Sequence, residues 1–368
     1  MSDSQGSFTL VAVGDLQLGD SSTCVGFGFA SRWAAHGMGP VLAASAEALG
    51  GGDILFGNLE CTLSPAGLEA GSWHSVQMRG IPGFAAQLYQ AGFRVLNVAN
   101  NHAVQHGAES FRETVACLRA AGIAPCGVRG RDGWCTEPVV ITTTAGVRVG
   151  ILGYCHRPRQ YGDETPPYAE GSRAEMLADL ARLHPTVDHV VISLHWGEEF
   201  VPLPSRPEVA LAHGLIEAGA ALIVGHHPHV LRPIVRYRNG VIAYSLGNFV
   251  ADMVWHEPLR RGAVLRAKVG RTGAQAAELI RTRISDEFTP SALGAADPVE
   301  GEAPGAGLDE ADYRAAIEAT ISAQRRAVYG YSLRNLHRFP AAMLAQLAAV
   351  TVRNKVAALR SLAGGGAK

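Results

Sequence analysis

Several features that would restrict the function of this 368-residue chain are missing from its sequence. The formal net charge is −1, so there is no basic field to attract nucleic acid or an acidic membrane surface. No uninterrupted apolar run reaches the roughly 18 residues of a membrane-spanning helix. The first residues also lack the basic start and apolar stretch of a signal peptide, so we expect a cytoplasmic protein.

Paired cysteines are missing as well, because none of the six forms a Cys-x-x-Cys motif. In a cytoplasmic protein we expect them to be free thiols. What the sequence does have is apolar residues, at 47%, with 18% charged residues, which is enough for a substantial core. The length allows one large domain or two ordinary ones.

Short apolar runs alternate with helical patterns through the first two thirds of the chain. This alternation predicts a layered α/β fold, with strands buried on both faces. The expected strands are 8–14, 53–57, 94–99, 139–143, 147–153, 189–194 and 221–224, and the expected helices are 41–49, 83–91, 109–121, 173–183 and 207–218.

The pattern changes after residue 230. Asn239-Gly240 between two apolar runs predicts a hairpin, and strand-like runs follow at 263–269 and 277–284. Residues 286–308 are rich in Pro, Gly, Ala and acids, which is typical of a linker or surface loop. Two helical stretches, 309–328 and 335–363, then follow. We therefore divide the chain into a catalytic core (1–285), a linker or surface loop (286–308) and a helical segment (309–368).

Polar residues follow the ends of successive expected strands. In an open α/β sheet, ligands bind beyond the carboxyl ends of the strands, so these residues are expected to gather there. Imidazoles and carboxylates suit zinc, manganese or iron, and a bridging carboxylate can hold two ions about 3.5–4 Å apart. We predict two divalent ions, with Mn, Zn, Fe, Mg and Ca all open. The predicted ligands are Asp15, Glu60, Asn101, His195, His227 and His229.

The His227-Pro228-His229 run is the strongest part of this set, because a cluster of histidines after an apolar strand is seldom structural. In an extended backbone its two imidazoles would point the same way, each toward a neighbouring metal. The alternative for Asp15 is a strand-end cap, and for Asn101 a turn with positive φ.

The order of the motifs carries a resemblance. The sequence has Gly-Asp at 14–15, Asn-Leu-Glu at 58–60, Asn-Asn-His at 100–102, His-Trp-Gly-x-Glu at 195–199, His-Pro-His at 227–229 and Ser-Leu-Gly-Asn-Phe at 245–249. Over about residues 8–250 this set resembles the CapA-type (poly-γ-glutamate capsule synthesis) branch of the calcineurin-like metallophosphoesterase superfamily. The resemblance implies a four-layer α/β/β/α sandwich around a dinuclear centre, here with added C-terminal helices.

The resemblance also implies individual roles. Asp15 falls on the first metal aspartate, Glu60 on the bridging acid and Asn101 on the metal asparagine. His102 falls on the catalytic histidine beside the metals, and His195, His227 and His229 fall on the three later histidines.

The chain also departs from the pattern. Gln17 stands where phosphoesterases usually have the histidine of Asp-x-His, and Gln105 stands where the branch usually has an acid. Membrane-tethered capsule proteins carry an anchor, and we expect none in this chain.

Three classes of function follow from this comparison. The main expectation is a peptide-modifying metalloenzyme, because the branch implies peptide-like substrates and the chain resembles an epimerase of lasso-peptide biosynthesis. Such an enzyme would invert the Cα of a C-terminal residue in a ribosomal (lasso) precursor peptide. The alternatives are a phosphoesterase or peptide/amide hydrolase, or a poly-γ-glutamate synthesis protein without catalysis.

Inversion is chemically reasonable at two metals, which would stabilise the enediolate formed beside a carboxylate. It also needs a base on one face and an acid on the other. The candidates are His102, His226, Glu199 and His156. We expect a peptide substrate, no nucleic acid and no membrane partner, and leave the oligomeric state open.

Tyr313, Ile317, Ile321 and Val328 give the first C-terminal helix one apolar face. These helices either cover the core or a second subunit, or form part of a peptide-binding groove. The basic residues available to attract an acidic peptide are Arg325, Arg326, Arg334, Arg338, Arg353, Lys355 and Arg360.

Because Gln17 replaces a metal ligand of ordinary phosphoesterases, we predict poor turnover of generic phosphate esters. The measurement is release of the phenolate from an aryl phosphate by metal-loaded protein, with Asp15→Ala as the control. Robust hydrolysis that disappears in Asp15→Ala would instead identify a phosphoesterase.

Overall fold

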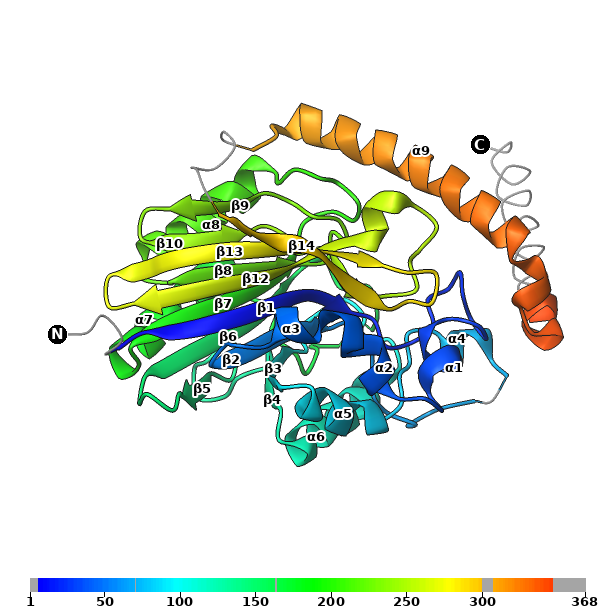
Figure 1. Cartoon of the computed structure of the whole chain (residues 1–368), viewed down its shortest axis with the longest axis horizontal. Helices are drawn as coiled ribbons and strands as arrows, with labels where there is room; N and C mark the ends of the chain where they lie inside the picture. Colours follow the sequence, from blue (N-terminus) through cyan, green and yellow to red (C-terminus); the bar gives the residue numbers. More distant parts are fainter. Residues whose placement is uncertain (1–5, 70, 163, 300–306, 347–368) are drawn as a thin grey trace, which may run out of the picture.

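The computed structural model describes residues 6–69, 71–162, 164–299 and 307–346. Two β-sheets pack face to face, and helices cover the outer face of each sheet (Figure 1). This arrangement confirms the expected four-layer α/β/β/α sandwich.

The first sheet has the strand order β14-β13-β12-β1-β2-β3-β4, with β11 paired to β1 off this path. Strands β1 to β4 run parallel, whereas β12 to β14 are antiparallel. The strands are β1 (Phe8–Leu16), β2 (Ile54–Leu59), β3 (Phe93–Asn97), β4 (Ala124–Cys126), β11 (Asn248–Val250), β12 (Arg261–Gly270), β13 (Gly273–Ile284) and β14 (Pro290–Pro298).

The second sheet has the order β5-β6-β7-β8-β10-β9, with a parallel centre and an antiparallel strand at each edge. The hairpin expected at Asn239-Gly240 is present as β9 and β10. The strands are β5 (Val139–Thr142), β6 (Arg148–His156), β7 (His189–Trp196), β8 (Leu222–His226), β9 (Ile234–Tyr237) and β10 (Gly240–Ala243).

The helices form the two outer layers. On the second sheet, Ser172 and Ser205 each begin a helix with a capping box, which satisfies backbone N–H groups that the first turn leaves free. The α-helices are α1 (Phe29–Trp33), α2 (Met38–Leu42), α3 (Ala46–Leu49), α4 (Trp73–Val76), α5 (Gly83–Gln90), α6 (Gly107–Ala121), α7 (Arg173–Leu183), α8 (Arg206–Glu217) and α9 (Glu310–Arg334). Short 3₁₀ turns are η1 (Ala43–Ser45), η2 (His184–Thr186), η3 (Glu257–Arg260) and η4 (Leu336–Arg338).

The hydrophobic core is layered in the same way. One cluster lies between the sheets and includes Phe56 of β2 and Leu222 of β8. A second packs the helices against the outer face of the first sheet, and a third packs α7 and α8 against the second. Central strands are therefore buried on both faces, which explains why they are almost entirely apolar. All six cysteines are free thiols.

Two sequence expectations differ from the structure, and a third lies partly outside the described residues. The expected helix 41–49 is divided into α2, η1 and α3. The expected linker or surface loop at 286–308 is wrong in part, because Pro290–Pro298 forms β14 and pairs with β13. An edge strand needs partners on one side only, so it tolerates proline and glycine that would disrupt a central strand. Part of the expected second helix, 347–363, lies outside the described residues.

Within the part of the chain that the structure describes, no helix is both long and apolar enough to cross a membrane.

Close backbone packing beside β1 explains the glycine before Asp15. β1 and β11 are paired so that Asp15 lies opposite Asn248, and the Asp15 N–H donates to Gly247 O at 2.9 Å. A Cβ added at Gly14 would lie 2.0 Å from Gly247 O. Any larger residue at position 14 would push these strands apart at the point where Asp15 is held.

We predict that Gly14→Ala lowers the free energy of unfolding by about 1–3 kcal/mol, the usual cost of overpacking. The control is Gly39→Ala in α2, where an added Cβ would meet no atom within 4 Å. That variant should keep its stability or gain about 0.5–1 kcal/mol. Chemical denaturation measures both, and equal stability of the two variants would contradict the packing argument.

Candidate metal centre

The six predicted ligands lie together at the carboxyl ends of strands from both sheets. Asp15 lies in the last part of β1, Glu60 directly follows β2 and Asn101 lies in the turn after β3. His195 lies in β7, and His227 and His229 follow β8. All six are buried.

Asp15 is the most connected of these residues. Asn58 Nδ2 donates to its Oδ1 at 2.8 Å, and the backbone N–H of His227 donates to its Oδ2 at 3.3 Å. Nδ1 of His226 lies 3.3 Å from Oδ1, and Nδ1 of His229 lies 3.3 Å from Oδ2. Asp15 therefore connects the end of β2 with the turn after β8.

Glu60 occupies the other side of the cluster. Gln17 Nε2 donates to its Oε2 at 3.3 Å, so the residue that departs from Asp-x-His contacts the expected bridging acid. Nε2 of His195 and Nε2 of His229 lie 3.4 and 3.7 Å from Glu60 Oε1. His195 Nε2 also contacts Asn101 Oδ1 at 2.7 Å.

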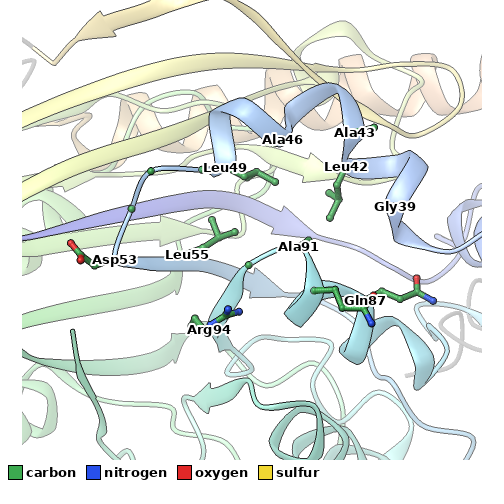
Figure 2. A pocket seen from close by; sticks show the side chains of 15 residues that line it. Gly39, Leu42, Ala43, Ala46, Leu49, Asp53, Leu55, Gln87, Ala91 and Arg94 are labelled. Atoms are coloured by element: carbon green, nitrogen blue, oxygen red, sulfur yellow. The ribbon is translucent and has the colours of Figure 1, made fainter. Parts of the chain in front are cut away.

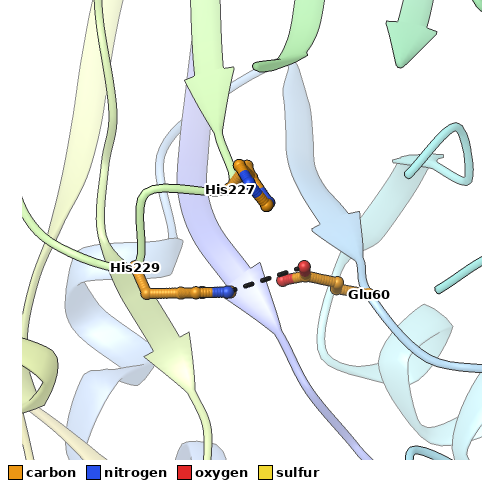
Figure 3. Close-up of side chains that lie close together, drawn as sticks. All are labelled: Glu60, His227 and His229. Atoms are coloured by element: carbon orange, nitrogen blue, oxygen red, sulfur yellow. Dashed lines mark ion pairs between the residues drawn. The ribbon is translucent and has the colours of Figure 1, made fainter. Parts of the chain in front are cut away.

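The donors fit a divalent cation. Glu60, His227 and His229 each offer a ligand atom, and these atoms all lie within 4.8 Å of one another (Figure 3). Among the described residues, Glu60 Oε1 and both ring nitrogens of His227 make no hydrogen bond although they are buried. Leaving such a polar atom unsatisfied costs about 1–3 kcal/mol, and a cation held between these atoms would satisfy them.

Electrostatics support the same assignment. Burial lowers the pKa of His195 and of His227 well below the usual range, so both are neutral, as metal ligation requires. Burial raises the pKa of Glu60 well above its usual value. Burial also opposes ionisation of Asp15, but hydrogen bonds and positive charge from His226 and His229 outweigh it and lower its pKa.

The pKa of His229 is shifted in the opposite direction from those of His195 and His227. Burial alone would lower its pKa, but the negative charge of Glu60 and the contact with Asp15 raise it to about 10. The groups that raise this pKa, Asp15 and Glu60, are the same carboxyl groups that are predicted to bind a cation.

The expectation of an extended His-Pro-His segment is wrong. His227 and His229 have φ values of 95° and 57°, and their ring planes meet at 56° with centroids 5.9 Å apart. The chain turns sharply after β8, and the left-handed backbone at both positions directs the two rings differently. His227 faces His195, at 4.7 Å between ring centroids, whereas His229 lies between the two carboxylates.

The four catalytic candidates lie in different surroundings. His102 is half-buried, and its Nδ1 contacts Gln105 Oε1 at 2.7 Å. Burial lowers the pKa of His102 to about 4. His226 is fully buried with its ring against Phe56.

Glu199 is exposed and lines the same cavity as Asn101 and His227. His156 contacts Gly171 O and lies in an adjacent cavity of about 510 Å³. Of the four, Glu199 is the one that lines the same cavity as two of the predicted ligands.

Three polar partners were not assigned a role from the sequence. Asn58 holds Asp15 and is itself held by Asn97 Nδ2 at 2.9 Å. Asn248 Oδ1 contacts His229 Nδ1 at 3.0 Å. Both belong to motifs that the sequence contains, so their position was a usable signal. Gln160, which accepts a hydrogen bond from Asn101 Nδ2 at 2.8 Å, follows no such motif.

Two of the predicted ligands line a cavity of about 410 Å³ that we call the cleft. These ligands are Asn101 and His227. Glu199, Arg157 and Ile317 of α9 also line the cleft. A different cavity, of about 520 Å³, lies between α2–α3 and α5 (Figure 2). Asp53 and Arg94 place it near the amino ends of β2 and β3, at the opposite end of these strands from Glu60.

A family model described as "Bacterial capsule synthesis protein PGA_cap" matches residues 9–253. The capsule biosynthesis protein CapA of Bacillus anthracis is 36% identical over 173 residues, covering 45% of this chain and 42% of that protein. The PGA biosynthesis protein CapA of Bacillus subtilis is 32% identical over 171 residues, covering 46% of this chain and 45% of that protein. The chain thus spans less than half the length of these relatives.

Among solved structures, a 5'-nucleotidase from Candida albicans aligns with 87% of this chain and 58% of its own. The sequence identity is 12% and the TM-score is 0.41.

We predict that Mn²⁺ binds the metal-free protein and stabilises it. At about 100 times the dissociation constant the gain is about 2.7 kcal/mol. His227→Ala and His229→Ala should lose most of this gain, whereas His226→Ala should retain more of it, because the donor set contains the first two residues. Calorimetry and metal analysis measure the effect. Equal, small losses in all three variants would show that the wrong histidines are assigned.

Proposed function

This chain belongs to the bacterial capsule synthesis protein family, PGA_cap, and from that premise we propose that it is a metal-dependent amide hydrolase acting on a peptide-like, glutamate-containing chain. The observation that carries the proposal is the buried donor set of Glu60, His227 and His229 beside the cleft. Among the described residues, Glu60 Oε1 and both ring nitrogens of His227 have no hydrogen-bond partner. The names of the two CapA relatives support the polymer as the substrate class.

The residues have two proposed roles, because some would bind the metal ions and others orient those ligands. Asp15, Glu60, Asn101, His195, His227 and His229 would hold the divalent ions. Such ions supply Lewis-acid activation of a carbonyl group and of water. Asn58 fixes the orientation of Asp15, and Gln17 fixes that of Glu60.

Glu199 is placed to exchange protons with a substrate. It lines the cleft beside His227, and it is exposed, so its carboxyl group can reach a bound chain. Its neighbour Glu198 is occupied differently, since it forms a two-point ion pair with Arg157 at 2.5 and 3.1 Å. In hydrolysis, Glu199 would take a proton from the attacking water and deliver it to the departing amide nitrogen as the C–N bond breaks.

Inversion at Cα is the second candidate function. It is favoured by two titratable side chains, His102 and Glu199, which follow different strands, β3 and β7. Tyr161 lies near both, with its ring 6.0 Å from that of His102 and its pKa raised by burial and by the charge of Glu199. An acid and a base on separate elements are what inversion requires.

One experiment separates the two candidates. Metal-loaded protein is incubated in D₂O with a glutamate oligomer and, in parallel, with a peptide that has a free C-terminal carboxylate. We expect new amine termini and shorter chains by mass spectrometry, lost in His227→Ala. Deuterium at a Cα in an intact chain would instead select epimerisation, and neither change would exclude both activities on these substrates.

A further inference from the structure

Helix α9 is not packed as a core helix. It has 25 residues, yet Gln324 and Tyr331 are its two buried side chains. Figure 1 shows it crossing one side of the molecule as a single continuous helix. The forces that hold it are therefore concentrated at particular contacts.

The first anchor lies at its amino end. Leu308 N–H donates to Pro204 O, and Arg206 N–H donates to Leu308 O, each at 3.0 Å. One helical turn later, the Tyr313 hydroxyl accepts from the Glu198 backbone N–H at 3.0 Å and from Arg232 Nη2 at 3.3 Å. The start of α9 is thus fixed to the loop that carries Glu199.

The second anchor lies past the middle of the helix. Gln324 accepts from Trp255 Nε1 at 2.9 Å and contacts His256 Nδ1 at 2.9 Å. Tyr331 is buried, with its hydroxyl 3.6 Å from Cys24 Sγ. Side chains of the middle part of α9 line two cavities, and Phe200 lines both of them.

Those cavities adjoin one another. The cleft is lined by Ile317 and Ile321, and a second cavity of about 420 Å³, the Leu231 cavity, is lined by Thr320, Ala323 and Gln324. Phe200 lines both. On the other side of the cleft, Arg157 and Pro158 also line the cavity that contains His156. The cleft, which Asn101 and His227 line, thus shares lining residues with two further cavities.

The charge of the Leu231 cavity indicates what it would bind. Arg261, Arg281 and His256 line it, and among the described residues that line it there is no carboxylate. The two arginines pair with Glu257 at 3.5 Å and with Asp297 at 3.2 Å, but these pairs are exposed and contribute little. A carboxylate on a bound chain can therefore compete for them.

We propose that an extended acidic peptide chain binds beneath α9, occupying the cleft and the Leu231 cavity together, so that the enzyme acts within a chain and not only at its end. The inference rests on the proposed function, since it takes the metal cluster as the reacting centre. Ile317 and Ile321 would contact the methylene part of the chain, and Arg281 its carboxylates. The helix arginines predicted to attract the peptide differ from this set, because Arg325 and Arg326 are exposed and line neither cavity.

The test is binding, measured by fluorescence anisotropy with labelled glutamate oligomers on metal-loaded protein. The long probe has about ten residues, about 33–36 Å when extended, and the short probe is a dipeptide. We expect the long probe to bind at least roughly tenfold more tightly, and Arg281→Glu to remove most of that advantage while leaving dipeptide binding unchanged. The matched control is Arg326→Glu, on the exposed side of α9.

Ala323→Trp supplies a second variant that fills the Leu231 cavity without changing charge, and thermal melting verifies that each variant is folded. The proposal is overturned if both probes bind equally, if neither binds, or if Arg281→Glu and Arg326→Glu have equal effects. Binding is read without turnover. A protein that binds long chains but neither cleaves nor exchanges deuterium would refute the proposed function alone, whereas cleavage unaffected by chain length or by Arg281→Glu would refute this inference alone.

Discussion

The buried carboxylate of Asp15 is the constraint on which the rest of the site depends. A carboxylate with no exposed surface is stable only when hydrogen-bond donors and positive charge surround it. These come from both sheets: Asn58 from the end of β2, and the backbone and side chains after β8. The sheets must therefore meet at this point, and Gly14 allows β11 to approach closely enough to complete the arrangement.

The loops that carry the predicted ligands also line the cleft beside them. The segment after β7 carries Glu199 toward the cleft, and its position is fixed by Arg232, a buried arginine that pairs with Glu208 at 2.5 Å. Tyr313 of α9 joins this network. The C-terminal helix is thus linked to the segment that carries Glu199, although it lies far from that segment in sequence.

The sequence was sufficient for the layers and for the gathering of the six predicted ligands, because both leave local signals. Strands buried on two faces are continuously apolar, and metal-binding side chains recur directly after them. It was insufficient where tertiary pairing decides the structure. The three-residue strands β4 and β11 are too short to show a period, and β14 has the composition of a loop because it lies at an edge. The direction of the His227 and His229 rings depends on backbone angles that residue spacing does not encode.

The left-handed backbone of His227 and His229 also makes their turn depend on contacts from distant parts of the chain. Each such residue raises the free energy of the folded state by about 1–2 kcal/mol, and the turn it forms must meet a partner, Asp15, that lies 212 residues earlier. The partner that holds this turn is thus not a neighbour in sequence. The turn is therefore held by tertiary contacts, and a variant without the Asp15 carboxylate would also lose the acceptor that fixes the backbone of His227.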